Sequence, residues 1–79
     1  MGEPRRLNKL ELGTGGKVLR CEAPGALGVR LAELGVVPGA TLRLLRRAPM
    51  GDPLELELMG YHLSLRGAEA ATIWVEVEG

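Results

Sequence analysis

Hydrophobic and polar residues alternate along this chain in short runs that glycines and prolines interrupt, which predicts short β-strands. The strand predicted at residues 54–59 begins with LELEL, which places leucines on one face and glutamates on the other, because successive side chains of a strand point to opposite faces. Similar alternation predicts further strands at residues 17–22, 41–48, 61–66 and 73–78. About five strands in so short a chain favour a mainly β fold, a small closed or half-closed barrel.

The alternation also predicts which side chains face the core. It places Leu19 and Cys21 on the inner face of the first of these strands, and Tyr61 on the inner face of the fourth. We therefore expect Cys21 to be a small core side chain rather than a metal ligand or redox sensor. The alternation breaks at Leu45, which predicts either a β-bulge or a change of sheet face near that residue.

One segment, residues 26–34, has the spacing of a short helix instead. Leu27, Leu31 and Leu34 recur at intervals of four and three residues, which lines them up as one apolar stripe on a helix. Gly35 follows directly and suits the position after a helix end, where a residue without a Cβ adopts a positive φ at little cost.

The remaining segments are short. Residues 67–71 are rich in alanine and predict a single helical turn, while residues 1–6 carry no apolar alternation and predict a flexible N-terminal tail. We therefore expect a tail at residues 1–6 and one domain at residues 7–79, since a chain of this length has room for one small domain.

Composition narrows the class of protein. Ten basic and ten acidic side chains cancel among 79 residues, whereas a general nucleic-acid binder carries a basic surplus. The single cysteine excludes an internal disulfide, and no apolar run approaches the roughly 20 residues of a membrane-spanning helix. One His, one Ser and one Asp leave few groups for a catalytic site. We expect a non-enzymatic cytoplasmic domain with no cofactor, no nucleic-acid partner and no membrane insertion.

The charges are nevertheless unevenly distributed. Residues 1–50 hold nine basic and four acidic side chains, a balance of +5, and residues 51–79 hold one and six, a balance of −5. Two interpretations follow: the two halves pair across one small fold, or they form oppositely charged surfaces that orient a partner.

Three segments of the chain together resemble one known family. They are RLAELGVVPG at residues 30–39, followed by the strand predicted at 41–48, then GDP at residues 51–53 and LRGAEAATIWV at residues 65–75. These motifs, at this spacing, resemble the FeoA family, ferrous iron transport protein A, and the likeness extends over nearly the whole chain.

The resemblance implies both a fold and a partner. The fold is an SH3-like β-barrel of about five strands with one short helix, and the protein is a small bacterial one of the cytoplasm that works with the ferrous-iron membrane transporter FeoB. The family is not known for an enzymatic activity of its own. Because an incompletely closed barrel leaves edge strands free, weak self-association is a further expectation.

The same barrel forms the C-terminal domain of iron- and manganese-dependent repressors, which leaves a second hypothesis: a domain that senses metal or contacts nucleic acid. His62 with Glu55 and Glu57 is the candidate ferrous-ion site for this hypothesis. The arginines of residues 43–47 are the candidate nucleic-acid contact. The simpler interpretation is a solvated polar face on which these arginines pair with the two glutamates.

A partner-binding surface is predicted on the helix and the loop that follows it. The candidate contact residues are Arg30, Leu34, Val36, Val37 and Trp74. The two valines are included because two adjacent valines beside a turn are not easily both buried. Trp74 falls on the outward face of the last strand, where an exposed Trp is either a contact residue or a cover for the barrel edge beneath the N-terminal segment.

Overall fold

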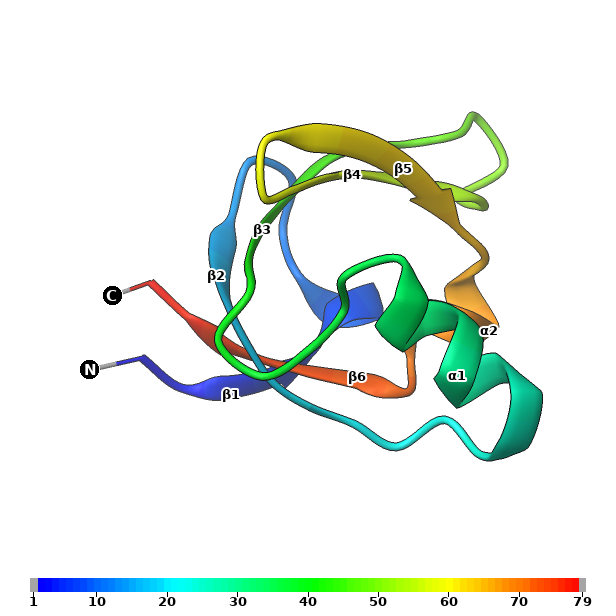
Figure 1. Ribbon diagram of the computed structural model, residues 1–79. Helices are drawn as coiled ribbons and strands as arrows, with labels where there is room; N and C mark the ends of the chain where they lie inside the picture. The colour runs from blue at the N-terminus through cyan, green and yellow to red at the C-terminus, as the bar shows by residue number, and fades with distance from the viewer. Residues whose placement is uncertain (1, 79) are drawn as a thin grey trace.

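Six antiparallel strands form the sheet of this protein, in the order β1-β6-β2-β3-β4-β5 (Figure 1). The computed structural model describes residues 2–78, so Met1 and Gly79, at the ends of the predicted tail and domain, lie outside the described residues. The strands are β1 (Pro4–Arg6), β2 (Gly15–Cys21), β3 (Thr41–Arg47), β4 (Leu54–Leu58), β5 (Tyr61–Leu65) and β6 (Ile73–Val77). The helices are the 3-10 helix η1 (Leu7–Lys9), α1 (Gly25–Glu33) and α2 (Gly67–Ala70).

The mainly β architecture predicted from the alternation is confirmed, with α1 as the predicted helix and α2 as the predicted helical turn. The sheet curves around an aliphatic core, and in the view of Figure 1 α1 lies on the side where β5 leads through α2 into β6. The leucines of β4 are completely or almost completely buried, as the LELEL pattern requires. Each fully buried leucine stabilises the fold by about 1.5–3 kcal/mol relative to an exposed one.

The N-terminal segment differs from its prediction. Pro4–Arg6 do not form a flexible tail but pair with β6, Arg5 opposite Val75 and Arg6 opposite Trp74. The segment carries no apolar alternation because all three of its side chains are exposed. Its position depends on a strand about 70 residues away, and a local pattern cannot reveal such a partner.

Two bulges modify the predicted faces. The register between β3 and β4 shifts between Leu44 and Arg46, so the predicted break at Leu45 is a β-bulge, the first of the two alternatives. A second shift, between Val18 and Arg20, was not predicted, and it buries Val18 while Leu19 stays at the surface. The predicted inward position of Leu19 is therefore wrong, whereas the partly buried Cys21 does pack against the core.

A two-residue turn joins β4 to β5. Met59 and Gly60 both have positive φ, 51° and 92°, which is the conformation of a type I′ turn. The turn makes Leu58 and Tyr61 the closing pair of the hairpin and fixes the register of every pair beyond it.

Candidate partner-binding surface

The helix α1 and the loop after it form the centre of the candidate surface. Leu31 is completely buried and anchors the helix on the core. Arg30 is exposed, and Leu34, the last residue of the predicted apolar stripe, caps the end of the helix and is also exposed, at 37%. Gly35, with φ of 104°, ends the helix as predicted, and its N–H donates to the carbonyl of Ala32 at 3.0 Å. The chain then turns back on itself, since the N–H of Val36 donates to the carbonyl of Leu31 at 2.9 Å.

The two adjacent valines point in opposite directions. Val36 is only 3% exposed and belongs to the core, so the prediction that it lies on the partner-binding surface is wrong. Val37 is 42% exposed, as predicted. The turn in which the N–H of Ala40 donates to the carbonyl of Val37, at 3.0 Å, holds the second valine outward.

The β4–β5 hairpin adds two side chains that the sequence prediction missed. Met59 and Tyr61 are exposed at its tip, although the alternation had placed Tyr61 inward. The Tyr61 hydroxyl instead lies across Gly35, where a Cβ would approach it to 3.2 Å. Met59 is held next to Thr41 by a hydrogen bond from its N–H to the Thr41 carbonyl, at 2.9 Å.

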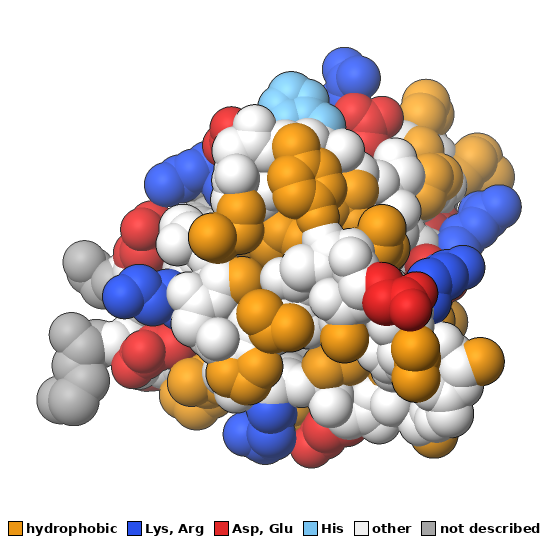
Figure 2. Space-filling view, viewed as in Figure 1, with side chains coloured by type: hydrophobic (Ala, Val, Ile, Leu, Met, Phe, Trp, Pro, Cys, Tyr) orange, Lys and Arg blue, Asp and Glu red, His pale blue; other side chains and the backbone are white. Residues whose placement is uncertain are grey.

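We call the exposed set Leu34, Val37, Met59 and Tyr61 the apolar face. Figure 2 shows hydrophobic side chains gathered over the centre of the side that carries the end of α1 and the β4–β5 hairpin. The signal that could have located Tyr61 there is the Met59–Gly60 turn, because the residue after a hairpin tip lies at the rim of the barrel.

Charged groups border this face. Arg30 forms an ion pair with Glu69 of α2, and the other carboxylate oxygen of Glu69 accepts a hydrogen bond from the N–H of Arg66 at 2.9 Å. The Arg66 N–H, followed by the Arg30 guanidinium, holds the pKa of Glu69 below its ordinary value of 4.5. Glu69 is therefore ionised at neutral pH and joins the two helices.

A groove of about 590 Å³ lies between α1 and the C-terminal end of β5. Arg30 and Leu34 form one wall, and Ser64 and Leu65 form the other. The groove continues the apolar face, since Leu34 belongs to both.

Trp74 has other neighbours than the rest of the predicted contact set. It lies half-buried on β6 between two guanidinium groups, with the Cζ of Arg6 4.5 Å and that of Arg20 5.0 Å from the ring centre. Its indole N–H lies near the Glu22 carboxylate but forms no hydrogen bond within the described residues, and together with Arg20 it lowers the pKa of Glu22. The arrangement corresponds to the alternative in which Trp74 packs under the N-terminal segment.

The arginines of the basic stretch are engaged within the protein. Arg46 pairs with Glu55 at 2.7 Å and Arg43 with Glu78 at 3.2 Å, while Arg47 donates to the carbonyl of Leu10 at 3.0 Å. The Arg46 and Arg43 pairs, together with the Arg30 pair, join the basic first half of the chain to its acidic second half, which supports the first interpretation of the charge asymmetry.

The candidate ferrous-ion site is not assembled. His62 lies opposite Glu57 across β4 and β5, but among residues 2–78 no three His, Cys, Asp or Glu side chains come together as they would to hold a metal ion.

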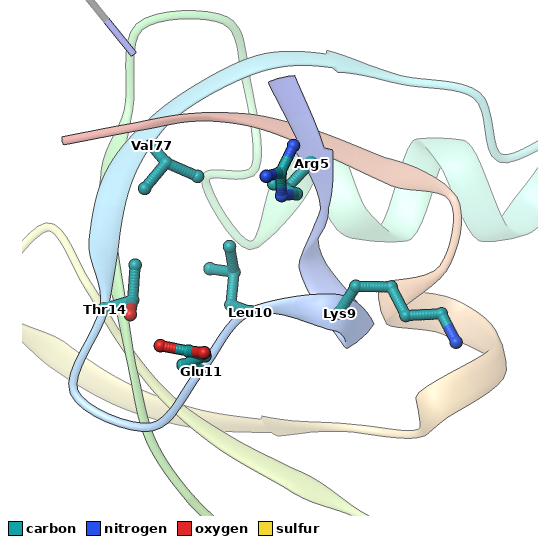
Figure 3. Close-up of a pocket in the computed structure, with 6 residues that line it drawn as sticks. All are labelled: Arg5, Lys9, Leu10, Glu11, Thr14 and Val77. Atoms are coloured by element: carbon teal, nitrogen blue, oxygen red, sulfur yellow. The ribbon is translucent and has the colours of Figure 1, made fainter. Parts of the chain in front are cut away.

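A second hollow, of about 280 Å³, lies between β1 and the start of β2 (Figure 3). Leu10 projects into it while Lys9 extends away, Arg5 is paired with Glu3 at 2.6 Å, and Glu11 is the one acidic side chain of its lining.

No helix in the described part of the chain is long and apolar enough to cross a membrane.

Comparison with known proteins decides the family. A family model for the FeoA domain matches residues 5–77. This chain belongs to the FeoA family. A FeoA structure from Chlorobium tepidum shares 39% identity and a TM-score of 0.89 with this protein, over 95% of this chain and 71% of the other. The resemblance found in the sequence motifs is thereby confirmed.

Two further relatives bear on function. The Fe(2+) transport protein A/Fe(2+) transporter FeoB fusion protein of Porphyromonas gingivalis is 38% identical over 91% of this FeoA-family chain, which spans only 8% of that relative's length. A FeoA from Stenotrophomonas maltophilia, described as an SH3 domain protein and solved in complex with zinc, shares 32% identity over 91% of this chain and 93% of its own, with a TM-score of 0.79. The SH3-like fold is thereby confirmed.

The repressor likeness is one of fold alone. A manganese-dependent transcriptional repressor matches 99% of this FeoA-family chain and 44% of its own with a TM-score of 0.87, at 23% identity. The similarity confirms that the repressor contains the same fold, as expected from the sequence, and identity this low carries no function.

Proposed function

We propose that this FeoA-family protein is a non-enzymatic accessory of ferrous iron uptake that acts in the cytoplasm by binding the cytosolic part of a FeoB transporter. The observation that carries the proposal is the Porphyromonas gingivalis relative, in which a FeoA module and a FeoB transporter are one polypeptide. Two modules that are fused in one organism act at one place, so the separate module needs a surface that holds it on the transporter.

The apolar face is the surface that fits this requirement. Leu34, Val37, Met59 and Tyr61 are large apolar side chains, each more than a third exposed. Five other large apolar side chains among residues 2–78 are similarly exposed, but none of them lines the groove that continues this face: Leu12, Leu19, Val29, Leu45 and Met50. Met and Tyr are enriched at protein interfaces relative to the rest of the surface, and apolar contact regions rimmed by charge are typical of docking sites. Arg30 at the border supplies a polar rim contact.

Trp74 stays outside the proposed surface. Arg6 and Arg20 cover its ring from two sides, so a partner would have to displace a guanidinium group to contact it. The predicted contact residues that we keep are Arg30, Leu34 and Val37.

Isothermal titration of this 79-residue protein into the purified cytosolic region of FeoB from the same organism tests the proposal. We expect saturable one-to-one binding with a Kd of roughly 1–30 µM, the range of a small, transient interface. Met59→Glu should weaken binding at least about tenfold, because it places a charge in the apolar face. Met50→Glu is the matched control, since Met50 is 93% exposed in the β3–β4 loop at the other end of β4.

Absence of binding by the correctly folded wild-type protein contradicts the proposal. Equal weakening by both methionine substitutions would contradict the assignment of the surface.

A further inference from the structure

The strand β5 has one free edge. It is the last strand in the sheet order and pairs only with β4. Because the type I′ turn makes Leu58 and Tyr61 a hydrogen-bonded pair, the antiparallel ladder alternates from there, and Leu63 and Leu65 also direct their main-chain groups toward β4. The N–H and C=O groups of His62 and Ser64 therefore point away from the sheet.

These main-chain groups are unpaired in the described part of the structure. None of the backbone hydrogen bonds between elements, turns and loops of residues 2–78 involves His62 or Ser64. Both side chains are exposed, so the edge is open to another molecule. An unpaired strand edge is a template for one kind of ligand, a second extended main chain.

The groove lies directly beside this edge. Ser64 belongs to the groove wall, and Leu34, directly after α1, faces it from the other side, so a chain paired with β5 would project alternate side chains between α1 and the sheet. The groove therefore supplies an apolar contact for one side chain of an extended segment, in addition to the main-chain hydrogen bonds.

The charge of the groove selects among such segments. Arg30 and Arg66 line it together with one carboxylate, Glu69, which leaves one positive charge in excess. Glu69 is occupied by the Arg30 guanidinium and the Arg66 N–H, and the Arg66 side chain forms no ion pair within residues 2–78. A segment that carries a carboxylate next to its apolar residue is complementary to this wall.

We propose that the protein binds its partner by strand addition: an extended segment with an apolar and an acidic residue pairs with the main chain of His62 and Ser64. The apolar side chain enters the groove against Leu34, and the carboxylate meets Arg66. The inference rests on the proposed function for the identity of the partner, the cytosolic part of the transporter, and names the way in which that partner is held.

A second copy of this chain fits the edge less well. Suppose that two β5 strands pair antiparallel with Leu63 of one copy opposite Leu63 of the other. A residue three positions after Leu63 then lies opposite the residue three positions before it, so Arg66 of one copy faces Gly60 of the other. Gly60 offers Arg66 no carboxylate. The charge in the groove therefore favours a different protein as the occupant.

The substitution Ser64→Pro tests this mode of binding. Proline removes the outward N–H and places its ring at the edge, where no intramolecular hydrogen bond is lost, so the fold should tolerate it. The matched control, Ser64→Ala, removes the hydroxyl and keeps the N–H. Titrated into the cytosolic region of FeoB, Ser64→Pro should bind at least about tenfold more weakly than wild type, and Ser64→Ala within about twofold of it.

Hydrogen exchange on the wild-type protein gives a second readout that needs no variant. The amides of His62 and Ser64 should exchange at least about tenfold more slowly in the complex than in the free protein. If the wild type binds, Ser64→Pro binds equally well and neither amide is protected in the complex, then strand addition is overturned while the proposed function stands. Failure of the wild type to bind overturns the proposed function, and this inference with it. A dimer of the free protein that Ser64→Pro dissociates identifies a second copy as the occupant and overturns the choice of partner.

Discussion

The guanidinium of Arg30, on α1, is paired with the carboxylate of Glu69, on α2. The pair joins the two helices at the border of the groove, and it brings together residues from the basic first half and the acidic second half of the chain. Since the Arg30 side chain is about half exposed, the pair contributes no more than about 1 kcal/mol to stability. Its main effect is to fix the position of the groove wall.

The lowered pKa of Glu69 predicts a pH dependence of stability. Its folded pKa lies below the ordinary value of 4.5, so the stabilisation is fully present above that value and is lost as the pH falls through the folded pKa. Urea unfolding from pH 7 down to pH 3 should show a declining free energy of unfolding. Glu69→Gln should flatten this decline, and Glu57→Gln, which removes a carboxylate without an ion pair in the described structure, should flatten it less. Identical pH profiles for the two variants would contradict the assignment.

The two adjacent valines give a clean separation of core from surface. Val36→Ala removes buried methyl groups and should lower the free energy of unfolding by about 1–3 kcal/mol. Val37→Ala should change it by less than about 0.5 kcal/mol, because the side chain is exposed, yet weaken binding to the transporter. Chemical denaturation and titration of both variants measure this. A larger loss of stability for Val37→Ala than for Val36→Ala is inconsistent with the structure.

The N-terminal strand predicts an effect of truncation. Removing residues 1–6 deletes β1 and the Arg6 side chain that covers Trp74, so the free energy of unfolding should fall by roughly 1–3 kcal/mol. The fluorescence of Trp74, the single Trp, should shift to longer wavelength as its ring becomes more exposed to water. Arg6→Ala should give a smaller shift of the same kind. A truncated protein with unchanged stability and fluorescence would show that the segment is a tail after all.

Much of the fold follows from local patterns, and the exceptions have a physical cause. LELEL, the leucine spacing of α1 and the break at Leu45 act over a few residues, and the structure confirms all three. The pairing of β1 with β6 joins opposite ends of the chain. The bulge after Val18 interrupts the alternation of β2, so Val18 and Cys21 both face the core, and no glycine or proline marks it. Neither can be predicted from alternation.

The sequence likewise predicts only part of the candidate surface, because local motifs locate some of its residues and the rest depend on long-range order. Leu34 and Val37 lie in the helix and the loop that the motif RLAELGVVPG covers, and the structure exposes both. That two adjacent valines beside a turn are not easily both buried does not say which of them is exposed, and the turn makes Val36 the buried one. Alternation places Tyr61 inward because it ignores how the barrel ends. The contribution of the hairpin tip to this face required the sheet order, which is a long-range property.

Gly35 predicts a local test of how the loop meets the hairpin. Its φ of 104° is costly for any residue with a Cβ, and that Cβ would lie 3.2 Å from the Tyr61 hydroxyl. Gly39 has a φ of 90° but open space around it. Gly35→Ala should therefore destabilise the protein by about 1–3 kcal/mol and more than Gly39→Ala does, as measured by thermal unfolding. If Gly39→Ala is the more damaging, the Tyr61 contact has been wrongly placed.

The central claim is that the surface formed by α1, its loop and the β4–β5 hairpin binds the cytosolic part of the transporter. Amide chemical-shift mapping of isotope-labelled protein during titration with that region of FeoB tests it most directly. We predict that the largest changes fall on residues 30–37 and 59–66, and that the amides around Met50 and Trp74 change little. Saturable changes centred on Trp74 or Met50, or no change at any residue at concentrations of about 100 µM, would contradict the account.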